Sequence, residues 1–236
     1  MTTNLDSTRL QHPGIVAVRG PDARKFLQGQ LSQDVLALGT GRVALAGFHN
    51  PQGRTLALLR VVPLAEEALL LLLPAALLPR VTASLQRVVL RSRLKLSDET
   101  DAWRLTGLAG PGAPPALAAA RLALESAGVG ALAGQRLAWR HATDPERFIV
   151  VAPAAAEPPV DWPAADARTE DAWRAADIAA GLPQVHPETA GAFVAQMLNL
   201  DALRAVSFDK GCYTGQEVIA RAHYRGRVKR RLQHFR

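Results

Sequence analysis

The sequence predicts an α+β fold made of two ferredoxin-like halves, because a similar order of elements occurs twice along the chain. In the first occurrence, apolar runs separated by turn residues predict strands, a helix and a returning strand. The ranges are strands at 43–49, 54–62 and 68–73, a helix at 74–88 and a strand at 89–96. No helix alternates regularly with every strand, which argues against a doubly wound parallel sheet.

The second occurrence begins at Trp103. It consists of a strand at 103–107, a Gly/Pro loop at 110–115, an Ala-rich helix to about Ser126, and strands at 136–141 and 148–152. The Ala- and Pro-rich residues 154–167 then predict a linker. A helix at 170–181 follows, and Gly181 and Pro183 are typical of its end.

The N-terminal region contains one strand and one amphipathic helix. Residues 1–12 are polar and are expected to be loose, whereas 14–19 predict a strand. After the turn at 20–22, apolar residues recur at helical spacing at Ala23, Phe26, Leu27, Leu31 and Val35. The sequence therefore predicts a helix through this segment.

The composition is that of a folded globular protein. The chain has 236 residues, of which 48% are hydrophobic and 21% charged, so a real core is expected. One cysteine excludes an intramolecular disulfide, and no secretory leader or membrane-spanning run is recognisable. We therefore expect a cytoplasmic location and no membrane partner.

The formal net charge of +7 is concentrated at the C-terminal end. Residues 218–236 contain no acid and seven cations, namely Arg221, Arg225, Arg227, Lys229, Arg230, Arg231 and Arg236. Such a run is as typical of a solvated connector as of a phosphate-binding surface. We expect a connector without a partner surface in this chain, because the run contains only Tyr224 and Phe235 as aromatic platforms for bases.

The most informative motif is residues 210–217, KGCYTGQE, which hold the only cysteine. Thr214 and Glu217 have the spacing of a capping box, which predicts a helix that begins near Gly215. Cys212 then precedes a helix N-terminus, where the helix dipole, Lys210 and Arg221 are expected to favour the thiolate. The motif indicates a reactive thiol, and the alternative is a buried cysteine that acts as a small hydrophobic residue.

Other site types have no support in the sequence. The six histidines are scattered, and one cysteine does not supply the four ligands that an iron–sulfur cluster normally takes. Gly-x-Gly-x-x-Gly after a strand, a Walker loop and Gly-x-Ser-x-Gly are all absent. No bound metal and no nucleotide cofactor are expected.

Residues 193–201, 206–221 and 226–230 closely resemble the YgfZ family, relatives of the glycine-cleavage T-protein (aminomethyltransferase). Weaker matches at 26–35 and 173–183 extend the resemblance over most of the chain. It implies a GcvT-like fold whose C-terminal β-barrel is absent or truncated here. It also implies a folate-binding accessory factor, with tetrahydrofolate as cofactor. The implied role is iron–sulfur cluster assembly or repair and cluster-dependent tRNA modification, with iron–sulfur enzymes or cluster carriers as partners.

The resemblance also implies site residues. The reactive site comprises Cys212, Lys210, Tyr213, Gln216, Glu217 and Arg221, and the folate site comprises Trp173, Gln30, Asp34 and Asp177. From its pattern alone, Trp173 is either a core residue or a platform for a flat heteroaromatic ring.

Two departures from the family bear on mechanism. The aminomethyltransferases carry an acidic residue after the turn that ends at Gly53, and this chain has none there; Ala179 replaces a usual glutamate. A conventional enzyme is therefore not expected. The alternatives are a folate-dependent one-carbon transferase and an RNA-binding module that uses the basic tail.

The expected domains follow from the same comparison. Residues 1–46 and 100–222 form a discontinuous folate-binding domain, 47–99 an inserted α+β subdomain, and 223–236 a basic connector to the missing barrel.

Overall fold

The computed structural model describes residues 4–124, 130–160, 162–166, 169–226 and 228–233. The chain divides into two compact units. Unit 1 comprises residues 1–13, 41–43 and 99–182, and unit 2 comprises residues 14–40, 44–98 and 183–236. These bounds differ from the expected domains, whose division by function stays a prediction.

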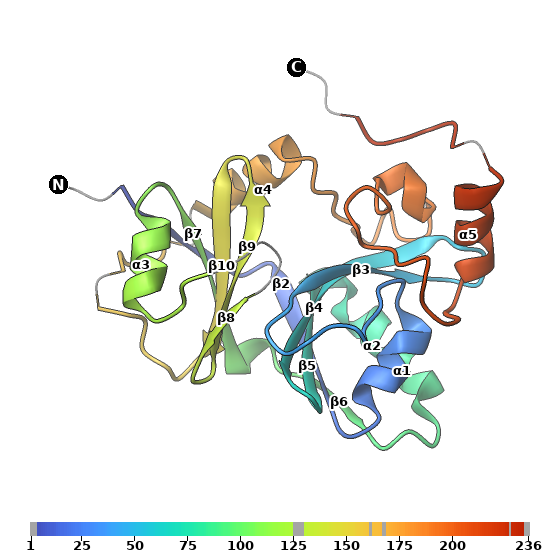
Figure 1. The fold of residues 1–236 in the computed structure, drawn as a ribbon, viewed down its shortest axis with the longest axis horizontal. Helices are drawn as coiled ribbons and strands as arrows, with labels where there is room; N and C mark the ends of the chain where they lie inside the picture. The colour runs from blue at the N-terminus through green and yellow to red at the C-terminus, as the bar shows by residue number, and fades with distance from the viewer. Residues whose placement is uncertain (1–3, 125–129, 161, 167–168, 227, 234–236) are drawn as a thin grey trace. The chain divides into compact units, whose positions relative to one another are not determined.

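Unit 2 contains a five-stranded sheet in the order β3-β4-β5-β2-β6. Its elements are β2 (Pro13–Arg19), α1 (Ala23–Gln30), β3 (Ala44–His49), β4 (Thr55–Ala65), β5 (Ala68–Pro74), η1 (Ala75–Leu77), α2 (Leu78–Val89) and β6 (Lys95–Asp98). Without the edge strand β3, this is the β-α-β-β-α-β order of a ferredoxin-like half. The predicted half begins only at residue 43 and does not include β2 and α1. Figure 1 shows α1 and α2 beside the sheet.

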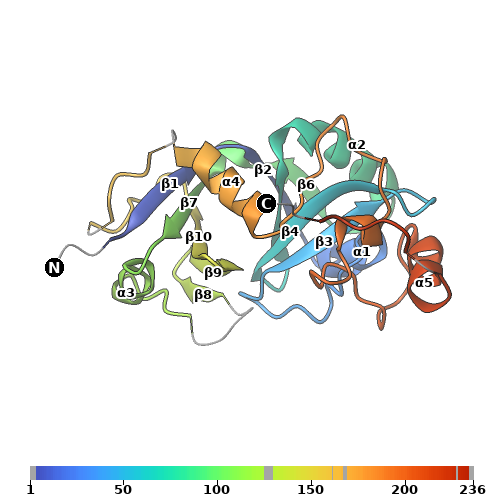
Figure 2. The same ribbon diagram turned by 90° about the horizontal axis from the view of Figure 1, so that it is seen from above.

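The core of unit 2 draws on both ends of the chain. Leu27 of α1 and Leu71 of β5 are buried in it, and so are Tyr213 and Ile219 from the C-terminal segment. That segment contains η4 (Ala195–Leu198) and α5 (Gln216–Tyr224) and lies beside the β3–β4 hairpin in Figures 1 and 2. The loop that carries the KGCYTGQE motif is therefore part of this unit.

Unit 1 is built on a second five-stranded sheet, in the order β1-β7-β10-β9-β8 with antiparallel neighbours. Its elements are β1 (Asp6–Leu10), η2 (Thr100–Ala102), β7 (Trp103–Ala109), α3 (Ala113–Ala119), β8 (Ala131–Ala133), β9 (Arg136–Thr143), β10 (Glu146–Pro153) and α4 (Glu170–Ala179). The elements follow one another as β7-α3-β8-β9-β10-α4, and β1 pairs with β7 at one edge of the sheet. Leu108, Leu117 and Phe148 belong to its core.

Several expected boundaries are wrong. Residues 6–10 are not loose, because they pair with β7 along their whole length. The helix that begins at Ala23 ends at Gln30, although Leu31 and Val35 are buried as the spacing indicates. The last strand of the first half is only Lys95–Asp98, the Ala-rich helix is only Ala113–Ala119, and the helix from Glu170 ends at Ala179. Ser126 lies outside the described residues.

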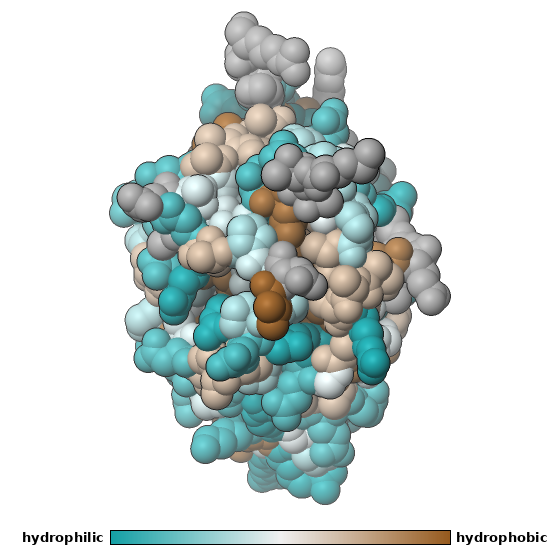
Figure 3. All heavy atoms as spheres, turned by 90° about the vertical axis from the view of Figure 1, so that its left-hand side faces the viewer, coloured by the Kyte–Doolittle hydropathy of each residue, from teal (hydrophilic) through white to brown (hydrophobic). Residues whose placement is uncertain are grey.

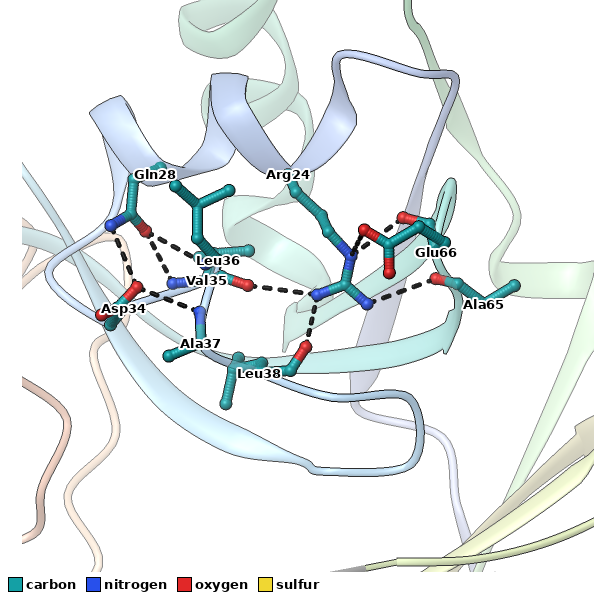
Figure 4. A network of polar contacts seen from close by, with 9 residues as sticks. All are labelled: Arg24, Gln28, Asp34, Val35, Leu36, Ala37, Leu38, Ala65 and Glu66. Atoms are coloured by element: carbon teal, nitrogen blue, oxygen red, sulfur yellow. Dashed lines mark hydrogen bonds and ion pairs between the residues drawn. The ribbon is translucent and has the colours of Figure 1, made fainter.

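A buried arginine fixes the loop that follows α1 (Figure 4). Arg24 is 6% exposed, and its guanidinium donates hydrogen bonds to the carbonyl oxygens of Val35, Leu38 and Glu66. The carboxylate of Glu66 adds an ion pair with N–O distance 3.3 Å. Because backbone carbonyls need donors when they are buried, one side chain joins α1, the loop and the β4–β5 turn.

The surface shows no sign of a membrane segment in the described part of the chain. None of the helices there combines the length and apolar character that crossing a bilayer requires. The face shown in Figure 3 is mainly hydrophilic, and its hydrophobic residues form small separate patches.

His49, at the end of β3, is buried without hydrogen bonds from its ring. It is 1% exposed, and neither ring nitrogen has a hydrogen-bond partner among the described residues. Gly47 leaves room for the ring, since a Cβ there would lie 2.2 Å from His49 Nε2. Burial lowers the pKa of His49 from 6.5 to about 4, so the folded protein holds the neutral form.

This burial makes stability depend on pH. Above pH 6.5 the imidazole is neutral in both states, whereas between pH 6.5 and about 4 the unfolded state binds the extra proton, so stability falls as the pH falls. We expect a loss of about 3 kcal/mol over this range, because each pKa unit corresponds to about 1.4 kcal/mol. Urea unfolding across the range measures it. His49→Leu should remove this loss, and the exposed-site control His223→Leu should keep it; equal slopes for all three proteins would contradict this account.

Candidate functional site

Lys210 fixes the loop before α5 by binding backbone carbonyls. Its Nζ donates to the carbonyl oxygens of Gln28 at 2.6 Å, Leu31 at 2.6 Å and Gln33 at 2.8 Å. Carbonyls in the last turn of a helix have no partner within the helix, and α1 ends at Gln30. Lys210 therefore caps α1 from a distant part of the sequence, with its charge placed favourably for the helix dipole.

The chemistry of this contact requires the ammonium form, because only –NH₃⁺ has three protons to donate. Burial lowers the pKa of Lys210 to about 8, and the charge of Asp34 opposes this shift, so the group stays protonated at neutral pH. The centre of the Tyr213 ring lies 4.9 Å from Nζ, so the ring shields the ammonium group from solvent. Burial also raises the pKa of Tyr213 to about 12.

The helix predicted after the motif exists, but its start differs from the expected capping box. Gly215 is the N-cap with φ of 84°, and no side chain caps the helix there. Instead the Gln216 side-chain oxygen accepts a hydrogen bond from Tyr213 N at 3.3 Å. The capping-box prediction for Thr214 and Glu217 is thus wrong, because a left-handed glycine, not Thr214, begins the helix.

Gly215 also touches the β3–β4 turn. A Cβ at Gly215 would lie 2.5 Å from the carbonyl oxygen of Asn50 and 3.0 Å from Cα of Gly53. A Cβ at Gly53, whose φ is 69°, would in turn lie 2.8 Å from Val218 Cβ. Two backbones therefore meet without a side chain between them, which only glycine permits in this conformation.

Between these fixed points, Cys212 is a free and exposed thiol. Because Cys212 itself is exposed, the alternative of a buried hydrophobic cysteine is wrong. Its neighbours Lys210 and Tyr213 are buried. Glu217 and Arg221 lie exposed on α5, whereas Gln216 is half-buried. The expected favouring of a thiolate by Lys210 and Arg221 stays a prediction.

Two of the residues predicted to bind folate lie at the end of α1. Asp34 accepts hydrogen bonds from Gln28 Nε2 at 3.0 Å and from Ala37 N at 3.2 Å, so it shapes its own loop (Figure 4). Gln30 is half-buried at the last position of α1. Asp34 therefore lies close enough to Lys210 for its charge to act on the ammonium group.

The other two, Trp173 and Asp177, belong to unit 1 and form a buried cluster that the sequence did not reveal. The guanidinium of Arg147 lies 4.8 Å from the centre of the Trp173 ring, and the His141 ring lies 5.5 Å from it. Asp177 Oδ1 lies 2.7 Å from Arg147 Nη1 and 2.8 Å from His141 Nε2. His141 comes from β9 and Arg147 from β10, and each strand contains other charged residues, so neither residue was distinguished by the sequence.

The electrostatics of this cluster favour a carboxylate. Burial on its own raises the pKa of Asp177, but the hydrogen bond with His141 and the charge of Arg147 outweigh it, so the pKa lies below its ordinary value. Arg147 is 2% exposed, and its Nε and Nη2 atoms have no hydrogen-bond partner among the described residues. Buried donors of this kind need an acceptor.

Metal ligands do not gather in the part of the chain that is described, since no three His, Cys, Asp or Glu side chains form a cluster.

The basic tail has a partner surface, contrary to expectation. Arg231 binds both carboxylate oxygens of Asp201, at 2.9 and 2.8 Å, and Leu232 N donates to Met197 O at 2.9 Å. The hydrogen bond from Arg231 lowers the pKa of Asp201. Asn199 Nδ2 also donates a hydrogen bond to Leu232 O at 2.9 Å. Asn199 and Asp201 lie just after the end of η4, so the tail is held along this segment. Arg227, Phe235 and Arg236 lie outside the described residues.

Known proteins share both sequence and fold with this chain. Residues 8–137 match the family described as GCVT N-terminal domain. The tRNA-modifying protein YgfZ of Serratia proteamaculans is 35% identical over 227 residues, which cover 94% of this chain and 68% of that protein. For the tRNA-modifying protein YgfZ of Photorhabdus laumondii the identity is 34%, covering 92% of this chain and 66% of that protein.

The aminomethyltransferase T of the Bartonella henselae glycine cleavage system has the same fold, with a TM-score of 0.69 at 20% identity, over 94% of this chain and 64% of that one. These matches define a GcvT-like α+β protein, as the sequence predicts. Within that class, the chain belongs to the YgfZ family. It spans about two thirds of the length of the YgfZ proteins it matches.

The three hydrogen bonds from Lys210 to backbone carbonyls lead to a prediction about stability. Lys210→Met keeps the length of the side chain but leaves three carbonyls without their donor, so we expect a loss of about 3 kcal/mol. Chemical denaturation measures it, and the control Lys95→Met, at an exposed site on β6, should stay within about 0.5 kcal/mol of the wild type. Equal midpoints for Lys210→Met and the wild type would show that the ammonium is not needed.

Proposed function

We propose that this chain is a folate-binding accessory factor that supports iron–sulfur enzymes in the cytoplasm, including enzymes that modify tRNA. The observation that carries the proposal is Cys212, a single exposed thiol between the buried anchors Lys210 and Tyr213. The names of the relatives, tRNA-modifying protein YgfZ, support the tRNA part of the role.

A fixed and exposed thiol suits transient work on clusters. A thiolate is a good ligand for iron, but a cluster normally takes four protein ligands and this chain has one cysteine. Cys212 would therefore act together with ligands of an iron–sulfur enzyme or cluster carrier. The rigid loop holds the thiol outward for such a partner and limits the conformational entropy lost on contact.

Folate binding is the second part of the proposal. The buried Arg147 donors without a partner, beside the Trp173 ring, fit a flat ligand that is rich in acceptors, such as tetrahydrofolate. Trp173 and Asp177 would hold the ligand in unit 1. The turn at Gly53 has no carboxylate, which weighs against the alternative of a folate-dependent one-carbon transferase.

The thiol is tested in a bacterial strain that lacks its own relative. Cys212→Ser should fold normally but fail to restore growth under oxidative stress and the nucleosides that iron–sulfur enzymes make in tRNA. The control is Gly211→Ala, at the exposed neighbouring position, where an added Cβ would have nothing within 4 Å. This variant should restore both the growth and the tRNA nucleosides. Growth curves and mass spectrometry of tRNA nucleosides are the measurements. Full rescue by Cys212→Ser would refute a role for the sulfur.

Folate binding is tested by restoring the glutamate of the relatives. Ala179→Glu places a carboxylate at an exposed helix position, and we expect tetrahydrofolate to bind about 10-fold more tightly through a charge-assisted hydrogen bond. The control Ala175→Glu, one turn earlier and also exposed, should leave the affinity unchanged. Titration calorimetry and quenching of tryptophan fluorescence report binding. No heat and no quenching in any of the three proteins would rule out folate.

A further inference from the structure

Three aromatic rings meet at the end of α5. The rings of Phe208 and His223 are stacked, with centroids 3.7 Å apart and planes inclined by 16°. The Tyr224 ring stands edge-on to both, at 6.0 Å from Phe208 and 4.8 Å from His223. Phe208 also packs against the core of unit 2, so the cluster is anchored from below.

The outer rings of this cluster are open to solvent. Tyr224 is 65% exposed, and His223 is exposed as well. Core packing explains the position of the Phe208 ring. It does not explain why the exposed rings of His223 and Tyr224 lie against Phe208. Exposed rings held in one orientation provide faces and edges on which a planar base can stack.

Exposed cations lie next to these rings in the sequence, on α5 and in the tail that follows it. Arg221 lies three residues before Tyr224, so the two side chains share one face of α5. Arg225 follows Tyr224 directly. Lys229 and Arg230 follow in the tail, and all four side chains are exposed. None of the four forms an ion pair with a described residue. One exposed acid, Glu217, lies a turn before Arg221 on α5, and the sequence from Val218 to the end contains no further acid.

The tail and α5 are both bound to the segment 196–201. Arg231 is bound by Asp201, which follows η4, and Gln196 of η4 donates a hydrogen bond to Ile219 O of α5 at 2.8 Å. η4 is thus bound both to α5, which holds two of the rings, and to the tail, which contains Lys229 and Arg230. The cations of the tail are therefore attached to a chain segment that is bound to the fold.

We propose that Phe208, His223, Tyr224 and the cations of α5 and the tail form a binding surface for an unpaired segment of RNA. The cations neutralise phosphates, and the rings stack on bases, which is how single strands are bound without duplex geometry. The proposal deepens the proposed function, on which it rests, by giving the tRNA a direct contact with this chain.

The test is fluorescence anisotropy of the 236-residue chain with a labelled single-stranded RNA oligonucleotide and with an unmodified tRNA transcript. Tyr224→Ala should weaken binding of the oligonucleotide by about 5- to 160-fold, the range for loss of one base stack, and leave its salt dependence unchanged. Tyr224→Trp, which keeps a ring, should bind like the wild type.

The charges are tested separately. The double variant Lys229→Gln with Arg230→Gln should reduce the slope of log affinity against log salt by about 1.4 if both side chains contact phosphates of a single strand. The control removes two charges from α2 and its end, Arg87→Gln with Arg91→Gln, where both side chains are exposed, and should change the slope little. Circular dichroism confirms that each variant folds.

Three outcomes would overturn the proposal: wild-type affinity in Tyr224→Ala, equal loss in the α2 control, or equal competition by heparin and by single-stranded RNA, which would indicate a non-specific polyanion surface. These outcomes are distinct from failure of the proposed function. That function is read by rescue with Cys212→Ser, and rescue by Tyr224→Ala in the same strain would remove only the RNA surface.

Discussion

The structure of unit 2 depends on one ammonium group placed among backbone carbonyls. Lys210 reaches the end of α1 and the loop after it, although more than 170 residues separate these segments along the chain. This contact completes the hydrogen bonding of α1 and fixes the loop before α5 at the same time. The exposed thiol of Cys212 and the start of α5 both take their positions from it. The cost of burying a charge is offset because each of its protons has an acceptor.

Local patterns in the sequence predicted the elements that local interactions determine. The strand at 14–19 and the helix after Gly215 follow from apolar runs and turn residues, and both are present. The exposure of Cys212 follows from its polar neighbours and is confirmed. Membership of the YgfZ family and the GcvT-like fold were also accessible, because long matches in the C-terminal segment carry them.

What the sequence could not predict depends on partners far along the chain. Residues 6–10 look like a polar terminus, and only pairing with β7 makes them a strand. The helical spacing through Val35 is satisfied by a loop, because Arg24 and Lys210 supply donors to carbonyls that a longer helix would have paired internally. The cluster of Arg147, His141 and Asp177 joins two strands and a helix, and no spacing in the sequence announces it. The rings at the end of α5 likewise include Phe208, which lies outside the basic tail.

The contact between Gly53 and Gly215 has a consequence for how this protein can change over evolution. A first β-carbon on either residue would overlap the opposite segment, so neither position can drift independently of the other. An insertion in the turn at 50–53 would lift it against α5 and displace the loop that carries Cys212, whereas surface turns usually tolerate added residues. The hairpin is therefore expected to keep its length even in relatives whose other loops vary widely.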